Sequence, residues 1–301
     1  MELNSLIFPK CASSLSSPQL FGRIIYVPQD SAQWLLTAPF VSSQSIPALY
    51  KANPTLFAKH GSYKGRCIPC LFIPSPRPSS KVMLYFHGNA EDAAAATDWL
   101  TSMARCLHVH ILAMEYEGYG VYPGSPSAQS VIDDAETVYR YLLRAMHVAS
   151  SDILLYGRSI GSGPACHLAA NHHPYSLILM SAFTSIRAVA KKYVGPLLQY
   201  LVAERFDNKK CIAKVKCPVF MVHGKRDDVV PCEHSIELSQ EIKGHYKLCL
   251  SESMNHNSMN FCEDILIPLK VFHNELAFST KPAAGRTGLL IFPLKAFNMP
   301  K

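Results

Sequence analysis

From about residue 66 onward, short apolar runs alternate with stretches whose apolar residues recur at helical spacing. Such an alternation is typical of β-α units around a mostly parallel sheet. The pattern predicts seven strands: "CIPCLFIP", "KVMLYFH", "VHILAMEY", "DILLYG", "YSLILMS", "CPVFMVH" and "YKLCLS". We therefore expect an α/β protein with helices on both faces of a mostly parallel central sheet.

One helix is predicted between the third and fourth of these strands, in "SPSAQSVIDDAETVYRYLLRAM". Its apolar residues recur at the spacing of one helix face. They are Ala128, Val131, Ile132, Ala135, Val138, Leu142 and Leu143. Ser125 and Pro126 are the predicted N-cap and first helical residue, so we expect this helix to start there and pack on the sheet.

The domain organisation predicted from the sequence is one core with two flanking segments. The core spans residues 66–277 and includes a helical lid at about 182–217. Residues 1–65 are expected to be irregular, apart from a possible strand at "GRIIYVP", and residues 278–301 are expected to form an appended tail.

Composition narrows the protein class. With 301 residues, 49% of them hydrophobic, the chain can bury a large core. Its first twenty residues lack the charged start and apolar middle of a signal peptide, and no segment predicts a membrane span. We therefore expect a cytoplasmic protein. Its ten cysteines are scattered, and Cys67 and Cys70 form the one close pair, so free thiols are expected rather than a zinc site.

A G-x-S-x-G pattern is the strongest chemical signal, although such a short pattern alone is weak. It runs from Gly157 through Ser159 to Gly161, with a predicted strand before it and a helical pattern after it. Glycines at these places let the backbone turn sharply while the serine stays at the tip of the turn. Ser159 is therefore a candidate nucleophile.

An activated serine needs a base and an acid, which in this architecture follow the serine along the chain in the order acid, then histidine. The acid candidates are Asp227 and Asp228, after the strand "VFMVHG". We favour Asp227 because it is nearer the strand end, but spacing alone leaves Asp228 open. The base candidate is His256, in the loop after the last predicted strand.

The other histidines fit these requirements less well. His245 precedes a strand, His234 belongs to the helix after the acid, and His108 and His110 share one strand. For the oxyanion of a tetrahedral intermediate, the predicted donors are the backbone N–H groups of Ile160, directly after the serine, and of Asn89, in "FHGNAED" near the start of the sheet.

Together these motifs resemble the serine α/β-hydrolases of the serine-aminopeptidase-like superfamily, and more narrowly the α/β-hydrolase domain-containing 17 group. The resemblance is carried by "FHGNAED", "EYEGYG", "YGRSIGSGPA", "SAFTSIR", "HGKRDDVVP" and "NHNS". It implies the α/β-hydrolase fold, a triad of Ser159, Asp227 and His256, and an oxyanion hole at Asn89 and Ile160.

The family usually has a glycine before the base and an acid two residues after it, where this chain has Asn255 and Ser258. Asparagine accepts a left-handed turn better than most residues, so we expect Asn255 to keep the loop. The animal members of the family remove fatty acyl groups from S-acylated proteins and carry an N-terminal cysteine cluster. This chain has one cysteine, Cys11, in its first 66 residues.

The lid is the most basic part of the chain. Between Ala182 and Cys217 lie eight basic residues and two acidic ones, an excess of six, while the whole chain carries +7. The basic residues are Arg187, Lys191, Lys192, Arg205, Lys209, Lys210, Lys214 and Lys216. One interpretation is a solvated helix face; the other is a surface that draws the site toward an anionic membrane or a negatively charged substrate.

An amphipathic helix is predicted within the lid, with an apolar stripe packed on the core. The stripe comprises Ile186, Ala190, Tyr193, Val194, Leu197, Leu198 and Leu201. Pro196 should kink or split this helix.

The sequence therefore predicts a serine hydrolase that cleaves an ester or thioester through an acyl-enzyme and needs no metal or cofactor. By resemblance, the leading substrate is an S-acylated protein. Alternatives are a lysophospholipase or carboxylesterase acting on an acyl lipid, a serine peptidase, and an inactive scaffold of the same fold. We expect contact with the cytosolic face of membranes, and no motif indicates nucleic-acid binding.

Overall fold

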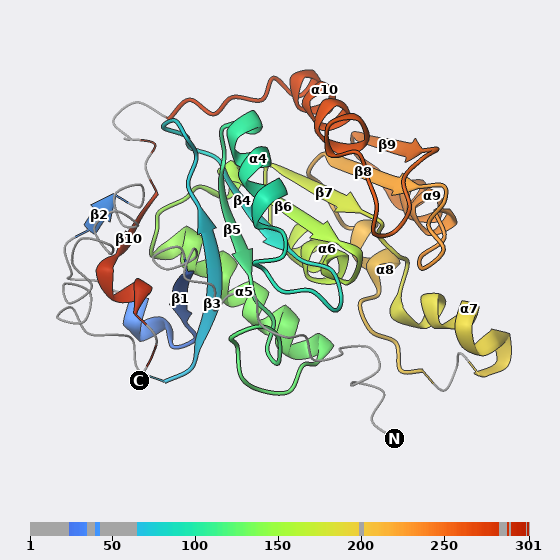
Figure 1. The fold of residues 1–301 in the computed structure, drawn as a ribbon, viewed down its shortest axis with the longest axis horizontal. Helices are drawn as coiled ribbons and strands as arrows, with labels where there is room; N and C mark the ends of the chain where they lie inside the picture. The colour runs from blue at the N-terminus through green and yellow to red at the C-terminus, as the bar shows by residue number, and fades with distance from the viewer. Residues whose placement is uncertain are drawn as a thin grey trace. The chain divides into compact units, whose positions relative to one another are not determined.

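The computed structural model describes residues 24–34, 40–42, 65–198, 202–282, 288, 290–298 and 300. One sheet of eight strands has the order β1-β3-β5-β4-β6-β7-β8-β9 (Figure 1). Its strands are β1 (Ile24–Pro28), β3 (Cys67–Ile73), β4 (Val82–Phe86), β5 (His110–Met114), β6 (Ile153–Arg158), β7 (Ser176–Met180), β8 (Val219–Gly224) and β9 (Tyr246–Ser251). All seven predicted strands are present, and the possible strand at "GRIIYVP" is β1.

The helices connect these strands as the alternating pattern predicts. They are α4 (Thr97–Leu107), α5 (Ala128–Arg144), α6 (Ser162–Asn171), α7 (Ile186–Leu198), α8 (Asn208–Ile212), α9 (Glu233–Glu241) and α10 (Ile267–Glu275). Short 3-10 turns are η2 (Ser31–Trp34), η3 (Ser150–Asp152), η4 (Ser159–Gly161) and η7 (Leu294–Phe297), and η6 (Phe261–Leu266) is π-helical.

The chain divides into two compact units. One holds Tyr85–Asn89 and Ile153–Ser279, and the other holds the described residues of Lys10–Leu84, Ala90–Asp152 and Thr280–Lys301. The predicted boundaries at 65 and 277 therefore do not coincide with these units. Each unit is described by itself below.

The second unit contains the antiparallel part of the sheet, where β3 pairs with β1 on one side and with β5 on the other. Helix α5 buries four residues of the predicted apolar face, Val131, Ala135, Val138 and Leu142, and the other three are half-buried. Its N-cap is Ser127 rather than Ser125, because the Ser127 hydroxyl accepts from the Ser130 N–H and the Ser130 hydroxyl accepts from the Ser127 N–H.

The C-terminal residues do not form an appended tail where the structure describes them. Phe292, in strand β10 (Ile291–Pro293), is fully buried and its ring centroid lies 4.9 Å from that of Phe72. Strand β10 pairs with β2 (Phe40–Ser42), and Gly288 accepts a backbone hydrogen bond of 2.7 Å from Ser79. The apolar pair and these backbone bonds make the segment part of the second unit.

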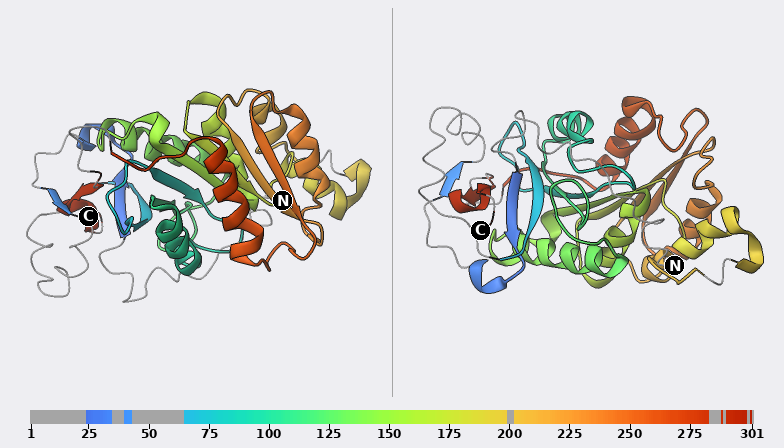
Figure 2. Two further views of the ribbon diagram at one scale, coloured as in Figure 1. Left: turned by 90° about the horizontal axis from the view of Figure 1, so that it is seen from above. Right: turned by 60° about the horizontal axis from the view of Figure 1, so that its bottom comes forward.

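The first unit contains four parallel neighbours, β6, β7, β8 and β9 (Figures 1 and 2). Every residue of β7 and β8 is buried, as expected for parallel strands covered on both faces, whereas β9 is half-exposed at the end of the strand order. The carboxyl ends of parallel strands meet at one edge, where open α/β sheets bind their ligands. This edge positions the candidate site.

Three further observations concern the described residues alone. None of their helices combines the length and the apolar character needed to cross a bilayer. No group of three or more metal-ligating side chains lies close enough together to hold a metal ion. Their cysteines, Cys67 and Cys70 among them, are all free thiols, while Cys11 falls outside the described ranges.

Candidate active site

The turn after β6 holds Ser159 at its tip. Strand β6 ends at Arg158, the backbone of Ser159 has a φ of 50°, and α6 begins at Ser162. A left-handed conformation costs a residue with a Cβ about 1–2 kcal/mol, so the surrounding structure must hold Ser159 there. This is the strained strand-turn-helix geometry expected of a nucleophilic serine.

The two glycines of the motif are required by close backbone approaches. A Cβ on Gly157 would lie 2.5 Å from the carbonyl oxygen of Gly161, and a Cβ on Gly161 would lie 2.2 Å from that of Phe86. Both distances are below any real Cβ contact. The turn therefore tolerates no side chain at either position.

Three side chains predicted to act together lie in one hydrogen-bonded chain. The Ser159 hydroxyl lies 3.1 Å from His256 Nε2, and His256 Nδ1 lies 2.8 Å from Asp227 Oδ2. Because the carboxylate can only accept, Nδ1 carries a proton and donates to Asp227. Nε2 is then free to accept from Ser159. All three residues are less than 10% exposed, so little water competes for these bonds.

The two candidate aspartates differ in orientation. Asp227 faces His256, while Asp228 is exposed. We call residues 227–231 the acid loop. Within it, Asp227 Oδ1 accepts from the backbone N–H groups of Val229 and Val230, at 3.0 and 2.8 Å. One carboxylate oxygen thus fixes the loop while the other faces the histidine.

Sequence reasoning missed His223, which ends up beside Asp227. Its Nε2 lies 2.8 Å from the Val230 carbonyl oxygen and 3.2 Å from Asp227 Oδ2, and its Nδ1 lies 2.6 Å from the Ser235 hydroxyl. Two acceptors face Nε2, so Nε2 carries the proton. Burial alone would raise the pKa of Asp227, but bonds from His223 and His256 lower it below its usual range.

The loop around His256 differs from its predicted conformation. We call residues 253–258 the base loop. Asn255 is not left-handed; instead its Oδ1 accepts from the N–H groups of Asn257 and Ser258, at 3.0 and 2.8 Å. The Asn255 N–H also donates to the Ser258 carbonyl. An asparagine side chain can close such a turn by bonding to the backbone two residues on, so no positive φ is required here.

Arg158 connects the nucleophile turn to the base loop. Its Nη2 donates to the His256 carbonyl at 3.0 Å and to Asn257 Oδ1 at 3.3 Å. The guanidinium therefore binds the base loop next to His256. Its contact joins residues 98 positions apart, which no local sequence pattern indicates.

The two predicted oxyanion donors come from backbone segments that approach each other closely. Ile160 is the second residue of η4, directly after Ser159. Asn89 follows the end of β4, and the backbone of the same segment, at Phe86 and His87, is what a Cβ on Gly161 would strike. The N–H groups of Asn89 and Ile160 stay our predicted donors.

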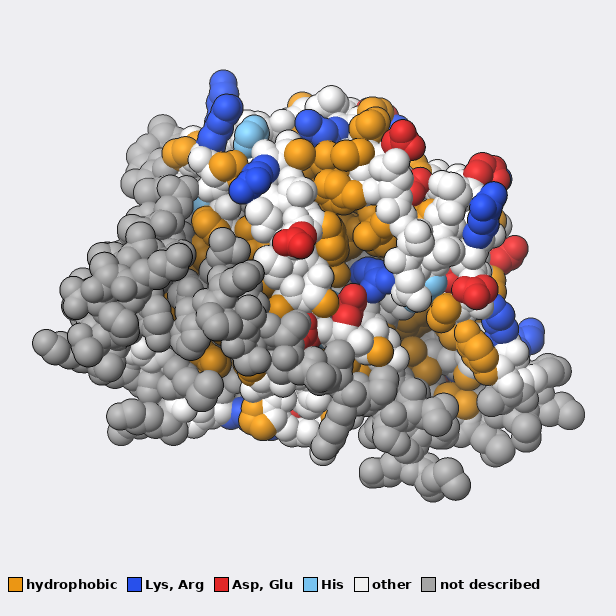
Figure 3. Space-filling model, in the orientation of Figure 1, with side chains coloured by type: hydrophobic (Ala, Val, Ile, Leu, Met, Phe, Trp, Pro, Cys, Tyr) orange, Lys and Arg blue, Asp and Glu red, His pale blue; other side chains and the backbone are white. Residues whose placement is uncertain are grey.

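Several basic side chains of the lid are paired with carboxylates, two of them inside the lid and one outside it. Arg187 lies 3.3 Å from Glu204, Lys210 lies 2.8 Å from Asp207, and Lys209 lies 2.5 Å from Glu237. Figure 3 shows acidic and basic side chains interspersed on the visible face rather than one basic field. Three lid cations thus face carboxylates.

The predicted lid helix is present as α7, and its kink falls at Gly195, directly before Pro196, where φ is 82° and ψ is 170°. Of its predicted apolar stripe, Ile186 and Ala190 are only half-buried, and Tyr193 is 62% exposed. The other stripe residues lie outside the described side chains. The expectation that this stripe packs on the core is wrong at Tyr193, whose hydroxyl bonds to the acid loop instead.

The chain is similar to known proteins in sequence and in fold. No protein-family model matches the chain. It is 27% identical over 209 residues to α/β-hydrolase domain-containing protein 17B of Homo sapiens, covering 69% of this chain and 72% of that protein. It is 28% identical to the 17C protein of Xenopus tropicalis, covering 69% of this chain and 66% of that protein. The resemblance inferred from the motifs is confirmed.

Solved structures of similar fold include esterases and an acylaminoacyl peptidase from Pyrococcus horikoshii, the latter at a TM-score of 0.54 and 13% identity over 78% of this chain and 45% of that one. One esterase is Est1E from Butyrivibrio proteoclasticus with bound ferulic acid, at a TM-score of 0.56 and 18% identity over 70% of this chain and 96% of that one. Another is acetyl xylan esterase 1 from Thermoanaerobacterium, at 0.53 and 15% over 71% of this chain and 80% of that one. The chain has the α/β-hydrolase fold, and its relatives support a hydrolase of that fold.

Proposed function

We propose that the protein is a serine hydrolase that cleaves an ester or thioester through an acyl-enzyme on Ser159, with an S-acylated protein as the leading substrate. The observation that carries this proposal is the continuous chain of hydrogen bonds from Asp227 through His256 to Ser159. This arrangement of nucleophile, base and orienting acid is one that activates a serine.

In the proposed reaction, Ser159 Oγ attacks the carbonyl carbon while His256 Nε2 takes the hydroxyl proton. The Asp227 carboxylate stabilises the imidazolium, and the N–H groups of Asn89 and Ile160 bind the oxyanion. His256 then returns the proton to the leaving group, and the acyl group stays on Ser159. Water, deprotonated by His256, attacks the acyl-enzyme, releases the carboxylic acid and restores the serine.

Two considerations support a thioester as the substrate. The resemblance to the α/β-hydrolase domain-containing 17 proteins implies S-acyl groups on proteins. A thiol with an ordinary pKa of about 8.5 also leaves more easily than an alcohol or an amine, so a thioester demands less of the acid. Lysophospholipids, other carboxylic esters and peptides are the competing substrates, because the same three side chains can act on each.

A fluorophosphonate probe, which phosphonylates activated serines, tests this proposal. We expect the wild-type protein to be labelled and Ser159→Ala not to be. Palmitoyl-thioester peptide should slow the labelling more than lysophosphatidylcholine or an unacylated peptide does. An unlabelled wild-type protein would instead support the inactive scaffold, and stronger competition by the lysophospholipid would support a lipase.

We also propose peripheral contact with the cytosolic face of an anionic membrane, where S-acylated proteins are held. The excess positive charge of the lid supports it, and one cation of that excess, Lys209, is paired with a carboxylate outside the lid, that of Glu237. We expect sedimentation with phosphatidylserine vesicles at low salt and release at high salt. Equal sedimentation with phosphatidylcholine vesicles would contradict this proposal.

A further inference from the structure

Helix α7 makes polar bonds to the rest of its unit through its described side chains, and none of these side chains is fully buried. Of those from Ile186 to Tyr193, Lys191, Lys192 and Tyr193 are exposed and the others are half-buried. Figures 1 and 2 show α7 beyond the strands of its own unit. The bonds made by Lys192 and Tyr193, in the middle of the helix, therefore contribute to its position.

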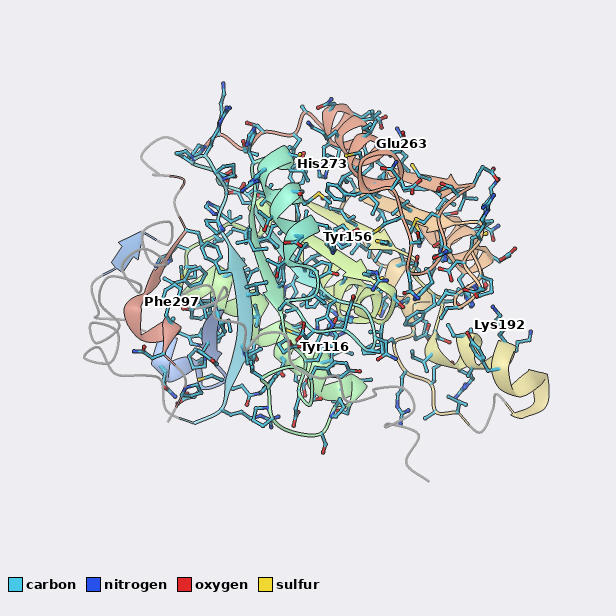
Figure 4. The ribbon with its side chains drawn as sticks, viewed as in Figure 1. Tyr116, Tyr156, Lys192, Glu263, His273 and Phe297 are labelled. Atoms are coloured by element: carbon cyan, nitrogen blue, oxygen red, sulfur yellow. The ribbon has the colours of Figure 1, made fainter. Side chains whose placement is uncertain are left out.

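Those bonds go to the acid loop. Lys192 Nζ donates to the carbonyl oxygen of Asp228, and the Tyr193 hydroxyl donates to that of Val229 at 3.1 Å. Lys192 Nζ also lies 5.9 Å from the centroid of the Tyr193 ring, within reach of a cation–π attraction. Figure 4 labels Lys192 on α7.

The same two peptide groups that α7 binds also hold Asp227. The peptide between Asp228 and Val229 presents its C=O to Lys192 and its N–H to Asp227 Oδ1. The next peptide presents its C=O to Tyr193 and its N–H to the same carboxylate oxygen. In a planar trans peptide, C=O and N–H point in opposite directions. A donor on the carbonyl side therefore fixes the direction of the N–H on the other side.

We propose that Lys192 and Tyr193 are positioning residues for Asp227, because they orient the two peptide N–H groups that fix its carboxylate toward His256. Hydrogen bonds in a chain polarise one another, so a cation on one carbonyl also strengthens the N–H bond to the carboxylate. The inference rests on the proposed function, since it assigns the lid helix a role in the same triad. It also makes the placement of α7 a determinant of activity.

Tyr193→Phe, Lys192→Met and the double variant test the proposal. Phenylalanine removes one hydroxyl, and methionine removes the charge while keeping an unbranched chain. Lys191→Met is the matched control, because Lys191 is an exposed neighbour with no bond to the acid loop among the described residues. Kinetics are measured with a soluble acyl thioester over a range of pH, and circular dichroism checks that each variant is folded.

We expect each single variant to lower kcat roughly two- to tenfold with KM unchanged, and the double variant to lower it further. The acid-side midpoint of the kcat/KM profile should move to lower pH, because a less well oriented carboxylate stabilises the imidazolium less. Lys191→Met should match the wild type in both readouts. Wild-type kcat and an unmoved profile in the double variant, or an equal loss in Lys191→Met, would overturn the proposal.

A readout without activity separates this inference from the proposed function. The His256 Nδ1 proton bonded to Asp227 should give a low-field proton resonance, assigned by its loss in His256→Gln. We expect the double variant to broaden it or move it upfield, and Lys191→Met to leave it in place. If the wild type cleaves no substrate and takes no probe, the proposed function fails, and this resonance still decides the positioning role. An unchanged resonance in the double variant would overturn it.

Discussion

The acid loop and the base loop follow neighbouring parallel strands, β8 and β9, yet different groups stabilise them. In the acid loop, backbone N–H groups hold Asp227 from within, and the buried side chain of His223 bonds to it from strand β8. In the base loop, the Asn255 side chain closes the turn from within, and Arg158 binds it from the nucleophile turn.

This difference has consequences for substitutions. The acid loop depends on buried groups and on peptide orientation, so few side chains can be exchanged there without leaving a buried polar atom unpaired. The base loop depends on two partly exposed polar side chains, whose hydrogen bonds compete with water. Apart from His256 itself, we therefore expect substitutions of the buried groups at the acid loop to have larger effects than those of the side chains that stabilise the base loop.

The largest effect should come from the acid itself. Asp227→Asn should lower kcat by about 10⁴, because an amide cannot hold the His256 tautomer that accepts from Ser159. Asp228→Asn is the matched control and should stay within about twofold of wild type, since its side chain is exposed and the carbonyl that Lys192 binds is retained. Steady-state kinetics on a soluble thioester would measure both. Similar losses in the two variants would contradict the assignment of Asp227.

His223→Leu should have the next largest effect, roughly ten- to a hundredfold in kcat/KM, because it leaves the Val230 carbonyl and part of Asp227 without a donor. The pKa of Asp227, now lowered by His223 and His256, should rise. A lowered folded-state pKa contributes stability that is present above about pH 4 and lost as pH falls through the folded value. The variant should thus unfold in acid at a higher pH.

Acid titration followed by circular dichroism measures that midpoint. Ser235→Ala is a useful comparison, because it removes the partner of the other His223 nitrogen and leaves the contact with Asp227 in place. An acid midpoint in His223→Leu equal to that of the wild type would show that His223 does not set the pKa of Asp227.

In the base loop, Arg158→Gln should lower kcat roughly tenfold, because the His256 carbonyl loses a charge-assisted bond. Arg158→Lys should lose less, since an ammonium can still reach one of the two acceptors. Steady-state kinetics on a soluble thioester would measure kcat for both variants. Equal rates for wild type and Arg158→Gln would show that the arginine does not position the base.

The smallest effect is expected for Asn255→Ala, a loss of about two- to fivefold in kcat, because the turn loses a side-chain acceptor exposed to water. Asn255→Asp keeps an oxygen at the same place and should retain wild-type kcat. If the alanine variant lost as much activity as His223→Leu, the contrast between the two loops would be wrong.

The strands and the site residues differ in how far the sequence predicts them. Each strand is an apolar run bounded by turn residues, so the local pattern is enough to predict it. The site candidates Ser159, Asp227 and His256 follow from their order along the chain and from the strands that they follow. Spacing cannot separate Asp227 from Asp228, because the direction of a side chain in a turn depends on hydrogen bonds to its neighbours. The sequence did contain one local indication that Asp227 has a second histidine partner besides His256. It is His223, near the end of the strand that precedes Asp227.

Three of the remaining differences depend on contacts between distant segments, and one, at α5, depends on local hydrogen bonds. Arg158 meets the base loop across 98 residues, and Phe292 packs on Phe72 although its segment resembles a loose tail. At α5, both Ser125 and Ser127 suit an N-cap, and reciprocal bonding with Ser130 selects the second. Tyr193 fits a buried stripe by spacing, yet its hydroxyl has an acceptor on the acid loop.

The central claim is that Ser159 carries an acyl group during turnover. Mass spectrometry of protein quenched in acid during hydrolysis of a palmitoyl thioester tests it directly. The account predicts one palmitoyl group on the peptide that contains Ser159, lost when substrate is exhausted and absent from Ser159→Ala. Turnover without an acylated Ser159, or turnover by Ser159→Ala at the wild-type rate, would contradict it.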